Sequence, residues 1–368
     1  MPKTASGLLV SGAVLLLAAA PAADGRVFRW GNDGAGTIYH RAPSEIKNIR
    51  EAVAVDASNA SSYALMPNGR VWAQGSGQDG ALGDGDAVKT SEAGVEVELP
   101  PGAQASAIGE AEHAGYAIVE GHLWAWGNNT AGVACLGGAR TTIPVPTEVP
   151  GITNAVEVQG AAIHVLIRLA NGTVDVCGSH GLGLGATAKV TEPTPIPGLA
   201  HVVQVSAGEH TSGVRTESGE VLMFGENSVG QLGDGNTKNS EKPTRVPLPG
   251  PASWLSVGGS DENGHCEALV NGVPYGWGFD ESGEVGDGSE ADKLRPVVDS
   301  QLVGLELESL VASGFTTLAL TQAGELYSLG VGEDLGTPTA EGSLAPVPIA
   351  SGVLEISGTA HNQLMLQG

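Results

Sequence analysis

Residues 219–235 read GEVLMFGENSVGQLGDG, and this pattern decides the fold. A turn glycine, Gly219, is followed six residues later by Gly225, which ends a short apolar strand. The same pair of glycines occurs seven times: Gly25/Gly31, Gly69/Gly75, Gly121/Gly127, Gly172/Gly178, Gly219/Gly225, Gly272/Gly278 and Gly324/Gly330. Successive closing glycines lie 44 to 53 residues apart, and a fixed period of this length is typical of a repeat protein.

Each repeat is expected to supply four strands. Asn-Gly pairs such as Asn171-Gly172 form hairpin turns, in which glycine adopts a positive φ. An apolar strand that ends in small residues precedes the hairpin, as in Val205 to Gly208, and small residues suit strands that converge on an axis. A glycine-rich stretch and a proline-containing segment such as Lys242 to Val246 complete the unit. We predict an all-β, single seven-bladed β-propeller with four-stranded blades.

The aromatic residues support the same architecture. Nine of the fifteen lie one or three positions before a closing glycine: Phe28, Trp30, Trp72, Trp124, Trp126, Phe224, Tyr275, Trp277 and Tyr327. Side chains two residues apart on a strand point to the same face of its sheet. We therefore predict that these aromatics form the core between neighbouring repeats.

The two ends of the repeat region complement each other. Residues 353–368 contain the inner strands of a repeat and stop where other repeats turn, whereas Asp24 to Val27 begin at that turn. We predict that N- and C-terminal strands share one blade and close the ring, which removes exposed sheet edges.

Residues 1–23 differ from the repeats. Lys3 precedes an apolar run from Leu8 to Ala20, and Ala22-Ala23 supply small residues for cleavage, which is the pattern of a bacterial-type signal peptide. The alternative is an uncleaved anchor. We predict a cleaved signal peptide at 1–23, a propeller domain at 24–368, and a secreted protein with no membrane span in its mature form.

Charge and cysteine content limit the partners. The formal net charge is −24 and there is no basic cluster, so we expect no nucleic-acid partner and favour a protein partner with a basic surface. Three cysteines, Cys135, Cys177 and Cys266, form neither a disulfide framework nor a metal motif. A Cys135–Cys177 bridge suits an oxidising compartment, but burial of all three as small apolar residues is the favoured interpretation.

The strand ending in Trp-Gly, the sequence Gly-Gln-Leu-Gly-Asp-Gly and the strand end Val-Ser-Ala-Gly resemble the repeat of the regulator of chromosome condensation family. The resemblance covers Asp24 to Gly368 and implies the propeller fold. It includes a distant similarity to a secreted propeller that inhibits β-lactamases. The family repeat has a histidine after the inner strand, which His113, His164, His265 and His361 match, while Ser61, Thr211 and Thr317 take its place elsewhere. We interpret these side chains as pins that hold each blade.

The loops after the inner strands supply the candidate site. They contain acids and one aromatic, and the candidate partner-binding residues are Glu110, Glu112, Glu209, His210, Asp261, Glu262 and Phe315. If these loops share a rim, they form a negative patch around the axis. Asp84, Asp234 and Asp287 lie in Gly-Asp-Gly turns and are interpreted as turn residues, since one carboxylate a turn is too few for calcium.

We therefore expect a secreted, monomeric, non-enzymatic propeller that binds a partner protein through the loops of one face, with no cofactor, catalytic residue or metal site. Three alternatives stay open. They are a guanine-nucleotide exchange factor-like regulator, an inhibitor of an extracellular enzyme such as a β-lactamase, and a hydrolase or lyase with an axial site.

Overall fold

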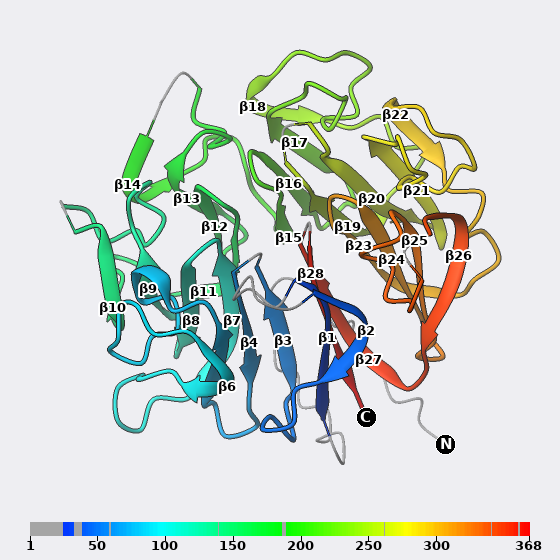
Figure 1. The fold of residues 1–368 in the computed structure, drawn as a ribbon. Helices are drawn as coiled ribbons and strands as arrows, with labels where there is room; N and C mark the ends of the chain where they lie inside the picture. Colours follow the sequence, from blue (N-terminus) through cyan, green and yellow to red (C-terminus); the bar gives the residue numbers. More distant parts are fainter. Residues whose placement is uncertain are drawn as a thin grey trace, which may run out of the picture.

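A computed structural model describes residues 25–32, 39–58, 60–138, 140–185, 189–260, 262–339, 341–359 and 361–368. These residues form seven four-stranded antiparallel sheets, arranged as blades around a central axis (Figure 1). The predicted all-β, seven-bladed propeller is confirmed. The predicted signal peptide lies outside the described residues. Among the residues that the model describes, no helix has the length and apolar character needed to cross a membrane.

The strands of each blade run from the axis outward, and blade 7 is described below. Blade 1 contains β3 (Ala54–Ala57), β4 (Ser61–Leu65), β5 (Val71–Gly75) and β6 (Ser91–Glu96), with the short 3-10 helix η1 (Gln78–Gly80) between β5 and β6. Blade 2 contains β7 (Ala105–Ala111), β8 (Ala114–Val119), β9 (His122–Asn128) and β10 (Thr142–Glu148). Blade 3 contains β11 (Ala155–Gly160), β12 (His164–Leu169), β13 (Val174–Ser179) and β14 (Lys189–Pro195).

The remaining three consecutive blades repeat this order. Blade 4 contains β15 (Val202–Ala207), β16 (Thr211–Thr216), β17 (Val221–Gly225) and β18 (Ser240–Arg245). Blade 5 contains β19 (Ala252–Gly258), β20 (His265–Val270), β21 (Val273–Gly278) and β22 (Lys293–Val298). Blade 6 contains β23 (Leu307–Ala312), β24 (Thr316–Thr321), β25 (Leu326–Gly330) and β26 (Ser343–Ala350).

Blade 7 closes the ring with strands from both ends of the chain. Its inner strands are β27 (Val353–Gly358) and β28 (Asn362–Gln367), and its outer strands are β1 (Arg26–Asn32) and β2 (Tyr39–Glu45). β1 pairs antiparallel with β28 from Arg26↔Gln367 to Gly31↔Asn362. The Arg26 guanidinium also donates a hydrogen bond to the Gln367 side chain, at 3.1 Å. The predicted sharing of one blade by the two ends is confirmed.

The closing glycines are required by close contact between backbones. Gly225 has a φ of 109°, and a Cβ on it would lie 2.2 Å from the His210 carbonyl oxygen. Gly127 has a φ of 92°, and its Cβ would lie 2.2 Å from the His113 carbonyl oxygen. Only glycine tolerates both the positive φ and the contact, so the period seen in the sequence marks the same turn in successive blades.

The tryptophan before a closing glycine fastens its blade to the preceding one. The indole N–H groups of Trp30, Trp126 and Trp277 donate to backbone oxygens of the preceding blade's glycine-rich loop, at 2.9, 2.8 and 2.8 Å. These three rings are fully buried, as is Phe224 at the same position. The predicted inter-repeat core is confirmed there. Three positions before the glycine, the prediction of a buried core is only partly right. The aromatic side chains there are half-buried: Phe28, Trp72, Trp124, Tyr275 and Tyr327.

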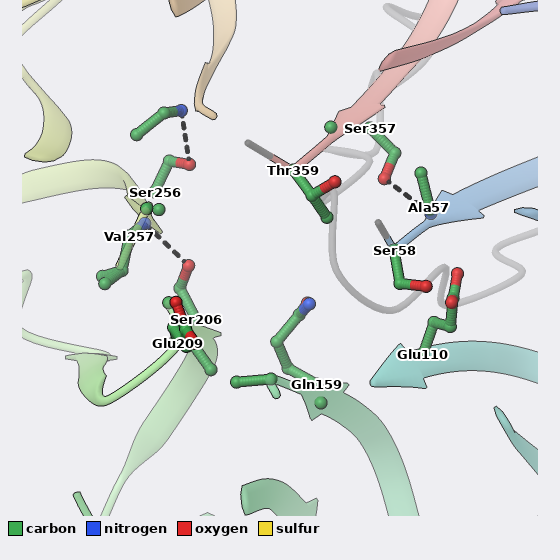
Figure 2. A pocket seen from close by; sticks show the side chains of 18 of the residues that line it. Ala57, Ser58, Glu110, Gln159, Ser206, Glu209, Ser256, Val257, Ser357 and Thr359 are labelled. Carbon is green, nitrogen blue, oxygen red and sulfur yellow. Dashed lines mark hydrogen bonds between the residues drawn. The ribbon is translucent and has the colours of Figure 1, made fainter. Parts of the chain in front are cut away.

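A second set of hydrogen bonds joins the inner strands around the axis. The hydroxyls of Ser206, Ser256 and Ser357 accept from backbone N–H groups of the next blade, at 2.9, 3.0 and 3.2 Å (Figure 2). Three longer side chains also accept hydrogen bonds from backbone N–H groups of the next blade: Glu157 from Val205, Gln204 from Leu255, and Glu355 from Val55. Each lies two residues before the position that serine occupies in β15, β19 and β27. These bonds satisfy N–H groups that face a neighbouring blade instead of a paired strand.

The outer edge of each blade is protected from pairing with other chains. Proline lacks an N–H group, and six of the seven outermost strands contain it, at Pro43, Pro144, Pro146, Pro193, Pro195, Pro243, Pro296, Pro346 and Pro348. The exception is β6, and there the Asn48 side chain donates to the Ala93 carbonyl oxygen at 3.2 Å.

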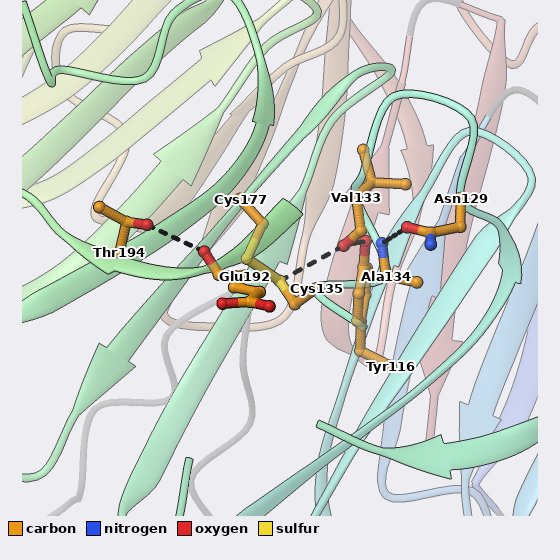
Figure 3. Close-up of a disulfide and its surroundings, with 8 residues drawn as sticks. All are labelled: Tyr116, Asn129, Val133, Ala134, Cys135, Cys177, Glu192 and Thr194. Carbon is orange, nitrogen blue, oxygen red and sulfur yellow. Dashed lines mark hydrogen bonds between the residues drawn. A yellow bond between two sulfur atoms is a disulfide. The ribbon is translucent and has the colours of Figure 1, made fainter. Parts of the chain in front are cut away.

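A disulfide joins blades 2 and 3 (Figure 3). Cys135, in the loop between β9 and β10, bonds to Cys177 on β13, with Cα atoms 5.6 Å apart and a sequence separation of 42. The favoured interpretation of these two residues as free thiols is wrong, because the repeat places the loop of one blade against the strand of the next. Cys266 is a buried free cysteine, as expected.

Removing this bridge is expected to weaken the whole ring. The double substitution Cys135→Ser and Cys177→Ser should lower the free energy of unfolding by about 2–4 kcal/mol, because the unfolded chain regains the freedom that the bridge removes. Urea unfolding of both forms without reductant measures the difference, and Cys266→Ser serves as the control for loss of a buried sulfur. Thiol titration of the denatured wild-type protein should detect Cys266 alone, and three reactive thiols would contradict the bridge.

Candidate functional site

The inner strands of all seven blades enclose an axial pocket of about 120 Å³. Its wall includes residues from every blade: Asp56, Glu110, Gln159, Ser206, Ser256, Val311 and Ser357. Its mouth lies among the loops that follow these strands, because Ser58, Glu112, Ala162, Glu209, Ser260 and Thr359 also line it. Figure 2 shows the side chains of Gln159 and Thr359 pointing into the opening. We call this opening, with its loops, the axial face.

The predicted site residues separate into three groups. Glu110, Glu112 and Glu209 line the pocket. Glu262 is exposed, and Asp261 lies outside the described residues. Phe315 and His210 instead form ring contacts near neighbouring blades: Phe315 stacks on His361 with centroids 5.0 Å apart, and His210 lies 5.8 Å from His180.

Glu110 differs from the expected surface acid. Its side chain is only 3% exposed, and Ser61 donates a hydroxyl hydrogen bond to its Oε1 atom at 3.1 Å. The reason is that β7 extends to Ala111, so Glu110 lies within this strand and not in the loop after it. β7 contacts β3 and β4 of blade 1, and this contact buries Glu110. Of the acids predicted for the rim, Glu112 and Glu209 line the mouth of the pocket, Glu262 is exposed in the loop after β19, and Glu110 lies deeper in the pocket wall.

Asp56 is a second buried acid in this wall, and the sequence prediction missed it. Its Oδ1 atom accepts hydrogen bonds from the Ala57 N–H at 3.0 Å and from the Ser357 hydroxyl at 2.9 Å. In the repeat it occupies the place of Ser206, Ser256 and Ser357 in other blades. Alignment of the repeats would have revealed it as the one carboxylate at a position where three blades have serine.

Burial changes the proton affinity of both acids. It raises the pKa of Asp56 to about 7, although hydrogen bonds from Ser357 and from the backbone of Ala57 and Glu110 oppose the rise. Burial also raises the pKa of Glu110 well above its usual range, and the neighbouring Asp56 charge adds to that rise. Burial therefore favours the protonated form of both acids, and a nearby cation would favour their ionised form.

Two of the family-like histidines are structural. Nε2 of His164 lies 2.7 Å from the Ser212 hydroxyl, and Nε2 of His265 lies 2.8 Å from the Thr317 hydroxyl, each in the following blade. Burial lowers the pKa of both imidazoles to about 3, so they are neutral. These histidines hold the blades in place as predicted, but each does so through a hydrogen bond with a hydroxyl group of the following blade.

His361 has a different environment at the junction of blades 6 and 7. Its side chain is about half exposed, and Nδ1 lies 3.2 Å from Oδ2 of Asp334. The Tyr39 hydroxyl donates to the other oxygen of Asp334. The bond to Asp334 raises the pKa of His361, so this histidine is easier to protonate than the two buried ones.

The Gly-Asp-Gly turns use their carboxylates locally. Oδ1 of Asp84, Asp234 and Asp287 accepts an N–H bond from the residue two positions later, at 3.2, 3.2 and 2.9 Å. Their interpretation as turn residues is confirmed. In the part of the chain that the structure describes, no three His, Cys, Asp or Glu side chains converge in a way that could hold a metal ion.

Comparison with known proteins agrees with this geometry. Residues 218–261 match the model of the regulator of chromosome condensation (RCC1) repeat. The chain is 32% identical over 134 residues to the human E3 ubiquitin-protein ligase HERC2, covering 36% of this chain and 3% of that protein. It is 34% identical over 118 residues to the ultraviolet-B receptor UVR8 of Arabidopsis thaliana, covering 31% of this chain and 26% of the receptor. The matched region therefore spans a small part of these relatives.

Solved structures resemble nearly the whole chain. Human WBSCR16 superposes with a TM-score of 0.82 at 18% identity, covering 94% of this chain and 99% of that one. Prp20p from Saccharomyces cerevisiae superposes with a TM-score of 0.80 at 20% identity, covering 94% and 92%. At these identities the likeness shows the fold. Together with the matched repeat, it identifies the chain as a seven-bladed β-propeller that carries the regulator of chromosome condensation repeat.

Proposed function

We propose that this propeller is a non-enzymatic binding protein whose axial face engages a partner protein with a basic surface. The observation that carries the proposal is the charge distribution of that face. Glu112 and Glu262 are exposed there, Glu209 is half-buried, and no lysine, arginine or histidine lines the pocket among the described residues. Acidic side chains gathered on one face create a negative potential that attracts a positive surface and speeds its association.

The rest of the structure favours docking over chemistry. The polar side chains of the inner strands are largely engaged in holding neighbouring blades, as the hydroxyls of Ser206, Ser256 and Ser357 show. A rigid wall of this kind presents its rim loops in fixed positions, so a partner can bind with little ordering of the propeller. Rim charges of this kind contribute more to association rate and specificity than to the energy of the final complex.

We also propose that the protein is exported before it folds. The apolar run from Leu8 to Ala20 and the small residues after it support export. The Cys135–Cys177 disulfide supports an oxidising compartment, because such bonds persist mainly outside the reducing cytosol.

The export proposal makes a direct prediction about the mature chain. Protein purified from the culture medium of its native host should begin at or within a few residues of Asp24, and N-terminal sequencing gives the answer. Substitution of the apolar run, for example Leu15→Arg with Leu16→Arg, should keep the protein inside the cell, since a charged segment is not recognised as a signal. A cytosolic protein that retains residues 1–23 would contradict the proposal.

The docking proposal predicts that rim charge controls partner capture. The triple variant Glu112→Gln, Glu209→Gln and Glu262→Gln should capture partners at least about tenfold less well at low salt, because the attraction to a basic surface is lost. Affinity capture from culture supernatant and cell-wall extract, quantified by mass spectrometry, measures the change.

The control variant removes three acids elsewhere. Glu92→Gln, Glu192→Gln and Glu241→Gln alter exposed side chains of outer strands β6, β14 and β18 and change the net charge equally. We expect this control to capture the same partners as the wild-type protein. Equal capture by the rim variant and the wild-type protein would contradict docking on the axial face.

A further inference from the structure

We infer that the axial pocket receives the ammonium group of a lysine side chain from the partner protein, with Asp56 and Glu110 as its acceptors. The inference deepens the proposed function, since it names the chemical group that enters the face on which the partner docks. It rests on the two buried carboxyls, the size of the pocket and the charges around it.

In each of the two carboxyl groups, one oxygen accepts hydrogen bonds and the other has no hydrogen-bond partner among the described residues. Asp56 uses Oδ1 for the Ser357 hydroxyl and the Ala57 N–H, and Glu110 uses Oε1 for the Ser61 hydroxyl. Among the described residues, Asp56 Oδ2 and Glu110 Oε2 have no hydrogen-bond partner. Asp56 is 7% exposed and Glu110 is 3% exposed, and both line the pocket. A buried acceptor without a donor is costly, so an ammonium that reaches these oxygens as the two side chains turn toward the pocket gains from both.

The pocket suits the end of one lysine side chain. One water molecule needs roughly 10–15 Å³ of such space, so the pocket's volume of about 120 Å³ leaves ample room for an ammonium group. A lysine ammonium is compact and carries three donors that can rotate, whereas the arginine guanidinium requires a planar pair of acceptors. Gln159 and Thr359 point into the same opening and supply further polar atoms to an entering ammonium (Figure 2).

The groups around the two carboxyls add negative charge and no cation. Asp56 faces Ser357 and Glu355 from β27 and Glu110 from β7. Glu110 faces Ser58 and Ser61 of blade 1, together with the hydroxyls of Tyr63 and Tyr116. Glu112 and Glu209 line the mouth above them. Among the described residues that line the pocket, an entering ammonium therefore meets only acidic or neutral side chains.

This arrangement links binding to pH. Burial raises the pKa of Asp56 to about 7 in the empty protein, and an ammonium beside it favours the ionised form. Binding then releases a proton, so affinity rises with pH. Between pH 6 and pH 8 the ionised fraction of such a group increases about tenfold, and the affinity for a lysine side chain should increase by about the same factor.

The test uses the purified mature protein and a capped peptide, acetyl-Gly-Lys-Gly-amide. The control peptide replaces lysine with norleucine, which has the same chain without the charge. Titration calorimetry at pH 6 and pH 8 should show that the lysine peptide binds, that it binds about tenfold more tightly at pH 8, and that the norleucine peptide does not bind. Repeating the titration in buffers of different ionisation enthalpy measures the released proton directly.

Two variants locate the site. Glu110→Gln and Asp56→Asn keep side-chain size and an acceptor oxygen, and each should weaken binding of the lysine peptide at least about tenfold and reduce its pH dependence. Glu148→Gln, on outer strand β10, is the control and should bind as the wild-type protein does, and thermal unfolding verifies that all three variants fold. No binding of the lysine peptide at pH 8, or equal binding by both site variants, overturns the inference. The rim experiment measures capture of whole partners, so either proposal can fail alone.

Discussion

The ring depends on one constraint, which is that the N–H groups of the inner strands must find acceptors in the neighbouring blade. Each innermost strand pairs with another strand on one side only, and the other side faces the preceding blade at a crowded axis. Serine hydroxyls near the pocket and longer side chains two residues earlier supply the acceptors, as in Val257 to Ser206 and Val205 to Glu157. Buried N–H groups without such partners would destabilise every junction.

The candidate site arises where this pattern changes. Blade 1 has Asp56 in place of the serine, so a carboxylate bonds the next blade and keeps one buried oxygen without a hydrogen-bond partner. Blade 2 has Gly109 there, and a Cβ would lie 2.5 Å from the Val158 carbonyl oxygen, so blades 2 and 3 approach closely without a side chain between them. The next residue, Glu110, then takes the polar role in the wall. The candidate site on this face is therefore built from exceptions to the structural repeat.

The fold could be predicted from sequence because glycine marks backbone contacts that recur in successive blades, as Gly127 and Gly225 show. The shared blade followed from where the repeat region starts and stops, since a ring leaves no free edge. The burial of Glu110 could not be predicted, and the Cys135–Cys177 bond stood only as an alternative, because both depend on how one blade lies against the next. A pattern within one repeat carries no information on that contact.

Hydrogen exchange at the inner strands tests the central claim most directly. Removing the Ser256 hydroxyl by Ser256→Ala leaves the Ala312 N–H without the acceptor that it has at 3.0 Å. The account predicts that Ala312 then exchanges faster by at least about tenfold, corresponding to a lost bond of about 1–2 kcal/mol, while Val257 keeps its protection through Ser206. Unchanged exchange at Ala312, with a folded protein and the same global stability, would contradict it.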